Sequence, residues 1–270
     1  METDEPLENG YGRTAPAGDN SCNDFQQALA DGYAALARAR GDRVERDTEL
    51  TMGDRASPSL FENFAVVHEP LGAAAWLGAA ERMHTFFGLA AGGNFLLFSA
   101  WPTPDLTDLG FGRVGHPPLM LRPAGPLAPV TVSGLAVRPV EDGATAHDWE
   151  QAFVRGFPTP ELEPVEQGCV LPVEALAAAG WRHWVGYLDT EPVATASAIV
   201  GATHVHVEFI ACVPAARGRG IGGAMTARAT LAAPELPALL IASDLGQPVY
   251  RRLGYQSILR FTLWAGHRRG

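Results

Sequence analysis

The chain has no lysine and only three cysteines. All twenty basic residues among its 270 are arginines, and against thirty acidic residues they give a formal net charge of −10. This negative balance argues against a nucleic-acid partner, because phosphates require a basic face. Cys22, Cys169 and Cys212 are far apart and form no Cys-x-x-Cys pair, so neither a disulfide framework nor a metal site is predicted. We therefore expect a cytoplasmic protein without a bound metal.

Long hydrophobic runs are also missing. The longest apolar stretches, near residues 71–80 and 94–101, are far shorter than the ~20 residues needed to cross a bilayer. The acidic first residues are not followed by an apolar run, so no signal peptide is predicted. A chain with 47% hydrophobic and 19% charged residues has the ordinary balance of a globular protein. At a typical ~150 residues per domain, one large or two small domains are expected. We expect no membrane partner.

Composition shifts divide the chain into segments. A polar start without periodicity predicts a disordered tail, and three prolines between Pro123 and Pro129 predict a linker. Both halves show a strand, a helix, a strand and a short helix that ends in Leu-Gly-aromatic, at Leu109-Gly-Phe111 and Leu253-Gly-Tyr255. The predicted segments are a tail (1–22), an N-terminal domain (23–122), the linker (123–130) and a C-terminal domain (131–270).

Two periodic patterns matter for the site. Phe25, Leu29, Tyr33 and Leu36 recur at spacings of four, four and three, which predicts an amphipathic helix over residues 24–40. A long strand is predicted over residues 203–213, within which residues 203–209 alternate strictly. The alternation predicts Val205, Val207 and Phe209 on one face, and His204, His206 and Glu208 on the other. A hairpin near residues 189–192 and a final strand over 257–264 are also predicted.

A glycine-rich loop follows this strand and opens a predicted helix over 221–232. It reads Arg-Gly-Arg-Gly-Ile-Gly-Gly from Arg217 to Gly223. Glycines let a backbone approach a ligand closely, and the amides at a helix N-terminus favour an anion such as a pyrophosphate. No Gly-Lys-Ser/Thr follows, so a P-loop nucleotide triphosphatase is not expected.

The loop fits two motifs. Counted from Gly218 it is Gly-x-Gly-x-x-Gly, with Asp244 beyond the next strand, as in a dinucleotide-dependent oxidoreductase. Three observations weaken this interpretation. Residues 214–217 separate the strand from the first glycine, few residues remain after Gly223 for the rest of such a domain, and the preceding hairpin indicates antiparallel neighbours.

Counted from Arg217, the loop is Arg-x-x-Gly-x-Gly. It is preceded by Ile-Ala-Cys-Val-Pro from Ile210, and a helix and a strand later comes Tyr-Arg-Arg-Leu-Gly-Tyr from Tyr250. In this order and spacing, the segment from about 131 to 270 resembles the GNAT superfamily of acyl-CoA-dependent N-acetyltransferases. The first half lacks the loop motif but repeats the element order, so it resembles the degenerate half of a tandem GNAT protein.

The resemblance implies an α/β fold: a mixed, mostly antiparallel GNAT sheet flanked by helices, with a smaller degenerate GNAT-like N-terminal domain. It implies acetyl-CoA as cosubstrate, without metal, and direct transfer of the acetyl group to a primary amine of a small molecule or peptide in a ternary complex. Two further hypotheses remain: a non-catalytic CoA-binding tandem module that senses or scaffolds, and the oxidoreductase. The N-terminal half would wall the acceptor cleft or form a homodimer interface.

The resemblance also assigns roles to residues. Tyr250 matches the tyrosine that serves as general acid to the CoA thiolate, and Glu208 and His206 lie where the family places water-linked bases. His204, Ser243 and Asp244 are weaker candidates, and Cys212 is expected to act as a small hydrophobe rather than a nucleophile. The residues expected to bind the cofactor are Ile210, Ala211, Cys212, Arg217, Gly218, Arg219, Gly220, Ile221, Gly222 and Gly223.

Overall fold

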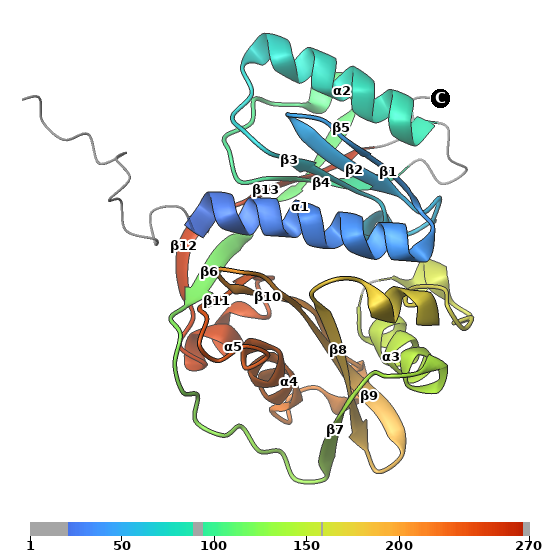
Figure 1. Ribbon diagram of the computed structural model, residues 1–270, viewed down its shortest axis with the longest axis vertical. Coiled ribbons are helices and arrows are strands. Elements are labelled where there is room, and N and C mark those ends of the chain that lie inside the picture. Colours follow the sequence, from blue (N-terminus) through green and yellow to red (C-terminus); the bar gives the residue numbers. More distant parts are fainter. Residues whose placement is uncertain (1–20, 89–93, 158, 267–270) are drawn as a thin grey trace, which may run out of the picture.

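Two β-sheets, each containing strands from both halves of the chain, form the framework of the protein (Figure 1). The computed structural model describes residues 21–88, 94–157 and 159–266. The six-stranded sheet runs, in spatial order, β1 (Arg43–Arg46), β2 (Leu50–Asp54), β3 (Phe64–Val67), β4 (Phe95–Ser99), β13 (Thr262–Gly266) and β5 (Phe111–Gly115). The seven-stranded sheet runs β12 (Gln256–Arg260), β6 (Pro118–Arg122), β11 (Ala238–Ile241), β10 (Val205–Cys212), β9 (Glu191–Val200), β8 (Trp181–Leu188) and β7 (Leu135–Pro139).

In the described part of the chain, five α-helices cover the sheets: α1 (Ser21–Arg40), α2 (Ala73–Gly88), α3 (Gly143–Gly156), α4 (Ile221–Thr230) and α5 (Gln247–Arg252). In the seven-stranded sheet, α4 packs on one face against alanines of β9, and α3 packs on the other face against β8 and β9. Only β10 and β11 are parallel among the described strands of this sheet. The fold is therefore the mixed, mostly antiparallel α/β arrangement that was predicted, and it does not fit a parallel dinucleotide-binding sheet.

Helix α1 lies between the two sheets, as Figure 1 shows. Its predicted apolar stripe is buried: Phe25 and Leu29 share one core with Phe64 of the six-stranded sheet and Leu239 of the seven-stranded sheet. The helix approaches β9 closely because Gly32 has no side chain, and a Cβ there would lie 2.5 Å from Cδ1 of Ile199. Nε1 of Trp181 in β8 also donates a hydrogen bond to the Gly32 carbonyl of α1, at 2.8 Å. The N-terminal half thus packs directly on the seven-stranded sheet.

The last strand of each half crosses into the other half's sheet. β6 inserts between β11 and β12, and β13 inserts between β4 and β5. The two crossings run side by side, because the amide of Phe261 donates to the Pro117 carbonyl at 2.9 Å. The predicted single strand over 257–264 is wrong at this point: the chain makes β12, changes sheet at the fully buried Phe261, and then makes β13.

Because of this exchange, the two expected domains share both sheets. The expected domains were residues 23–122 and 131–270. However, β6 from the first lies in the seven-stranded sheet, and β13 from the second lies in the six-stranded sheet. The tail expected over 1–22 is too long by two residues, because α1 begins at Ser21; residues 1–20 lie outside the described residues. The linker expected over 123–130 contains no helix or strand, but it is not free of the fold. Val130 packs near Gly223 of α4, and Val132 packs near Gly220.

Candidate functional site

The ladder between β10 and β11 is short. These parallel strands pair only at Val205 with Ala238 and at His206 with Leu239, whereas β11 continues along β6 for four residues. Beyond His206 the β11-facing edge of β10, which includes Ile210, Ala211 and Cys212, is outside this ladder. An unpaired strand edge presents N–H and C=O groups that can bind an extended ligand as another strand would.

A β-bulge in β10 shapes this edge. On the β9 side, Glu208 pairs with Ser197 and Ala211 pairs with Thr195, so Phe209 and Ile210 together oppose one residue. Phe209 has a φ of 50°, in the left-handed region that is rare for a non-glycine residue. The Thr195 hydroxyl donates to the Phe209 carbonyl at 2.7 Å, which stabilises this conformation.

The bulge overturns part of the predicted alternation. Phe209 was expected to share the face of Val205 and Val207, which pack in the core with α4. Instead it packs on the opposite face, in the core formed with α3, where it stacks on Trp181 with ring centroids 5.5 Å apart. The extra residue in the strand shifts the side-chain phase, so Glu208 and Phe209 both face α1.

The glycine-rich loop has the open geometry that an anion requires. Gly218 and Gly220 adopt left-handed φ values of 76° and 83°, and α4 begins at the next residue. A Cβ at Gly218 or Gly222 would have no atom within 4 Å. The first amides of α4 have no intrahelical acceptor, as in any α-helix, and they lie beside this open space.

The loop's other side chains have different surroundings. Arg217 is exposed and its guanidinium donates to the Cys212 carbonyl and the Gly156 carbonyl, both at 3.0 Å, so it fastens the loop to β10 and to the end of α3. Arg219 is exposed. The Ile221 side chain is buried in the core, which leaves its backbone amide for a ligand. Burial raises the pKa of the Cys212 thiol, as expected of a small hydrophobe and not of a nucleophile.

The predicted catalytic residues lie together on this edge. Nε2 of His206 is 2.6 Å from Oε1 of Glu208. Tyr250, on α5, is buried, and burial followed by the negative charge of Glu208 raises its pKa to about 12. Glu208 keeps 15% of its side chain exposed, whereas His206 is fully enclosed, and the ring of Phe25 of α1 lies tilted against it with centroids 4.1 Å apart. Glu208 is therefore the member of the pair that solvent reaches.

The weaker candidates have other partners. His204 is buried, and desolvation followed by His206 lowers its pKa to about 4. The Ser243 hydroxyl accepts from the Gly246 amide at 3.2 Å, and Oδ1 of Asp244 accepts from the Gln247 side chain at 3.2 Å. Both therefore stabilise the turn before α5. Among the described residues no group of histidine, cysteine and acidic side chains could hold a metal ion, and no helix could cross a membrane.

Tyr33 is a site residue that sequence reasoning missed. Its hydroxyl donates to Oε2 of Glu208 at 3.0 Å, although the two residues are 175 positions apart. The apolar stripe of residues 24–40 placed Tyr33 in a core, but no local pattern indicates which strand that core contains.

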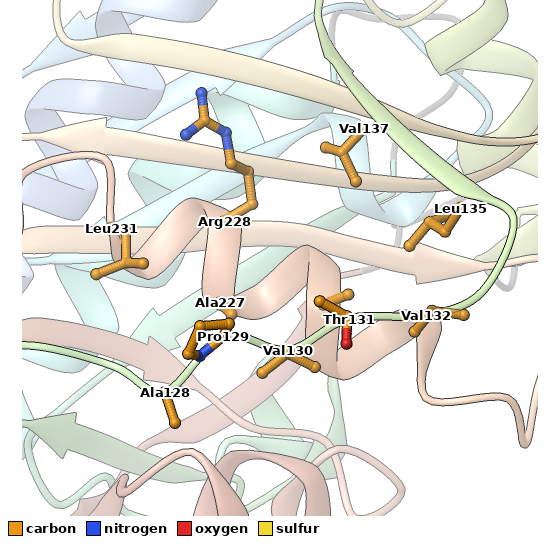
Figure 2. Close-up of a pocket in the computed structure, with 11 residues that line it drawn as sticks. Ala128, Pro129, Val130, Thr131, Val132, Leu135, Val137, Ala227, Arg228 and Leu231 are labelled. Atoms are coloured by element: carbon orange, nitrogen blue, oxygen red, sulfur yellow. The ribbon is translucent and has the colours of Figure 1, made fainter.

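A separate pocket of about 340 Å³ lies between the linker and α4 (Figure 2). Figure 2 shows the linker running past α4, with Leu135 and Val137 of β7 at the other side. Its walls are apolar except at Thr131 and Arg228, and it does not include the β10 edge or the catalytic candidates. The lining residues are Ala128, Pro129, Val130, Thr131, Val132, Leu135, Val137, Ala224, Ala227, Arg228 and Leu231.

The site combines an open strand edge, a glycine-rich loop and a helix N-terminus in a mostly antiparallel sheet, which is the arrangement that the GNAT resemblance implies. Comparison with protein families agrees: residues 179–257 match the acetyltransferase (GNAT) domain. The matched segment runs from the end of the connection before β8 to the start of β12, and it includes the glycine-rich loop and Tyr250. No curated protein matches the chain in sequence.

Solved structures share the fold of the whole chain. A GCN5-related N-acetyltransferase from Kribbella flavida aligns with a TM-score of 0.66 and 22% identity, covering 93% of this chain and 96% of that one. A GCN5-related N-acetyltransferase from Sphaerobacter thermophilus aligns with a TM-score of 0.56 and 15% identity, over 92% and 94% of the two chains. A tandem GNAT protein from the clavulanic acid biosynthesis pathway aligns with a TM-score of 0.54 and 13% identity, over 94% and 97%.

Proposed function

We propose that the protein is an acetyl-CoA-dependent N-acetyltransferase that moves an acetyl group directly to a primary amine of a small molecule or peptide. The observation that carries this proposal is the early end of the β10–β11 ladder beside the open loop at the start of α4. The GNAT match over residues 179–257 supports it.

The residues present fit acetyl-CoA. Ile210, Ala211 and Cys212 offer a free strand edge to the amide-bearing pantetheine arm. Backbone amides from Gly218 to Gly223 surround a space that side chains leave open, and they would hold the pyrophosphate. Arg219 adds positive charge at this loop, while Arg217 acts mainly by holding the loop to β10. Bound acetyl-CoA supplies the thioester whose C–S bond breaks.

Glu208 would act as the base. It accepts a proton from the substrate ammonium, directly or through water, and the freed amine lone pair forms the new C–N bond to the thioester carbonyl. A backbone N–H near Ile210 or Ala211 would stabilise the negative charge that develops on the carbonyl oxygen. Nε2 of His206 lies 2.6 Å from Oε1 of Glu208 and would help to orient the carboxylate.

Tyr250 would interact with the leaving sulfur. A phenol whose pKa is raised to about 12 stays protonated throughout the physiological range. It donates a hydrogen bond to the developing thiolate, but complete proton transfer to a thiol with an ordinary pKa of ~8.5 is uphill. We therefore assign to Tyr250 the stabilisation of charge on sulfur, with the thiolate taking its proton from solvent after it leaves.

The role of the loop can be tested by Gly222→Asp. The new side chain would point into open space and sit in the first turn of α4, where a carboxylate favours the helix, so the fold should be preserved. Its charge should repel the pyrophosphate and weaken acetyl-CoA binding in calorimetry by a factor on the order of 10 to 100. The matched control is Ala144→Asp, an exposed residue at the same helical position in α3.

Equal affinity of Gly222→Asp and Ala144→Asp for acetyl-CoA would contradict this site. A protein that binds acetyl-CoA at this loop but acetylates no amine would support the non-catalytic CoA-binding module instead.

A further inference from the structure

Tyr33 of α1 connects the N-terminal half to Glu208. The Tyr33 ring is fixed on several sides: it stacks on Trp181 with centroids 6.1 Å apart, on Phe209 at 6.3 Å, and meets Phe64 edge-on at 5.3 Å. These rings come from three elements and both sheets. The Tyr33 hydroxyl is therefore held in one place, and it donates to Oε2 of Glu208 at 3.0 Å.

The charged and titratable groups around Glu208 are few. His206 lies against its other carboxylate oxygen, and Tyr250 is close enough for the Glu208 charge to raise its pKa. Across the sheet, Ser197 pairs with Glu208 in register and hydrogen-bonds His183, whose pKa burial lowers to about 3, so this histidine is neutral. Arg40 of α1 interacts with Tyr33 electrostatically. Among these described groups, Tyr33 is the one from α1 that donates a hydrogen bond to Glu208.

We propose that Tyr33 is a positioning residue for Glu208, so that the N-terminal half completes the transfer site. This inference rests on the proposed acetyl transfer. His206 and Tyr33 contact different oxygens of the carboxylate, and together they fix its orientation. Burial, followed by the charge of Glu208, raises the pKa of Tyr33 well above its usual range, so the hydroxyl always has its proton to donate.

Removing this donor has a specific consequence. A hydrogen bond to a carboxylate stabilises its charged form, so Tyr33→Phe makes Glu208 easier to protonate. A charge-assisted hydrogen bond of this kind corresponds to a shift of about one pH unit. The acidic limb of the kcat/KM profile should move up by that amount and kcat at low pH should fall, while KM for acetyl-CoA stays unchanged.

The matched control is Tyr187→Phe. Tyr187 is also buried and its hydroxyl also donates to a carboxylate, Oδ2 of Asp148 at 2.7 Å, in a part of the sheet away from β10. Both variants keep the aromatic ring, and thermal melting checks that both remain folded. The shift of the acidic limb should appear in Tyr33→Phe and be absent in Tyr187→Phe. In a Glu208→Gln background, Tyr33→Phe should cause no further change in the profile.

A second measurement does not depend on turnover. Carbon-13 NMR of the glutamate carboxyls follows protonation directly, with the Glu208 signal assigned by its loss in Glu208→Gln. We expect the Glu208 titration midpoint to rise by about one pH unit in Tyr33→Phe. An unchanged midpoint would overturn the inference. If the wild type binds acetyl-CoA but transfers to no amine, the proposed function fails, and this NMR comparison still decides whether Tyr33 holds Glu208.

Discussion

A buried carboxylate on α3 gives the most sharply defined stability prediction, through the change Glu150→Gln. Glu150 is fully buried. Its oxygens accept three backbone amides of one loop, from Gly168 at 2.9 Å, Val170 at 2.7 Å and Leu171 at 2.8 Å. Nδ1 of His147 lies 3.5 Å from Oε2 of Glu150. The carboxylate therefore fastens the loop that leads into the 3₁₀ turn at Val173–Ala177.

The loss of unfolding free energy expected in Glu150→Gln follows from what each carboxylate oxygen of Glu150 accepts. Oε1 accepts two of the amides, and a glutamine oxygen can keep both as weaker, neutral hydrogen bonds. At Oε2 the glutamine NH₂ would face the Gly168 amide, donor against donor. Losing one charge-assisted bond of about 1.5–3 kcal/mol and weakening two others, less the relief of a buried charge, leaves a loss of about 2–3 kcal/mol.

Urea unfolding at pH 7 would measure this loss as a lower midpoint with an unchanged slope. The control is Glu161→Gln, an exposed glutamate in the same connection, which should change the free energy of unfolding by less than about 0.5 kcal/mol. If Glu150→Gln also cost less than that, the three hydrogen bonds would not be what stabilises the loop.

Three further predictions follow from the site, the buried histidines and the exchanged strands. Tyr250→Phe should lower the rate of thiol release by about tenfold or more and leave the calorimetric affinity for acetyl-CoA unchanged; a loss of affinity alone would contradict its role at sulfur. Burial lowers the folded-state pKa of His183 to about 3 and of His204 to about 4. Below pH ~6.5, the pKa of a histidine in the unfolded chain, the unfolded chain binds more protons than the folded one. Each of the two buried histidines should therefore lower the free energy of unfolding by about 1.4 kcal/mol per pH unit. In urea titrations, the free energy of unfolding should fall less between pH 6.5 and pH 5 in His204→Gln than in the wild type. An equal fall in both proteins would count against the buried histidine as its cause. Because β6 and β13 pair in opposite sheets, a chain cut after Pro126 should give fragments that are unfolded apart by circular dichroism and fold when co-expressed; two independently folded fragments would refute the exchange.

The sequence was sufficient to predict features with local signals. The loop from Arg217 to Gly223 and the strand before it were predicted from glycines and alternation, and the structure fastens this loop to β10 beside the open strand edge. The role of Tyr250 came from the GNAT resemblance and stays a prediction. The stripe on α1 was predicted as buried, and it is.

Other features depend on contacts that no local pattern encodes. β2 is buried at every position although it contains Gly53 and Asp54, and β1 is mostly charged, so neither strand was predicted. The change of sheet at Phe261 and the bulge at Phe209 arise from tertiary packing. For the same reason the contact between Tyr33 and Glu208 was not predicted: it requires knowing that α1 crosses β10.

The most direct test of acetyl transfer is a thiol-release assay with acetyl-CoA across a panel of primary amines. The panel should include polyamines, amino sugars, amino acids and peptides, with mass spectrometry of the amine product. The account predicts that at least one amine stimulates thiol release, with one acetylated amine formed per thiol. Acetyl-CoA binding without amine-dependent thiol release from any member of the panel would contradict it.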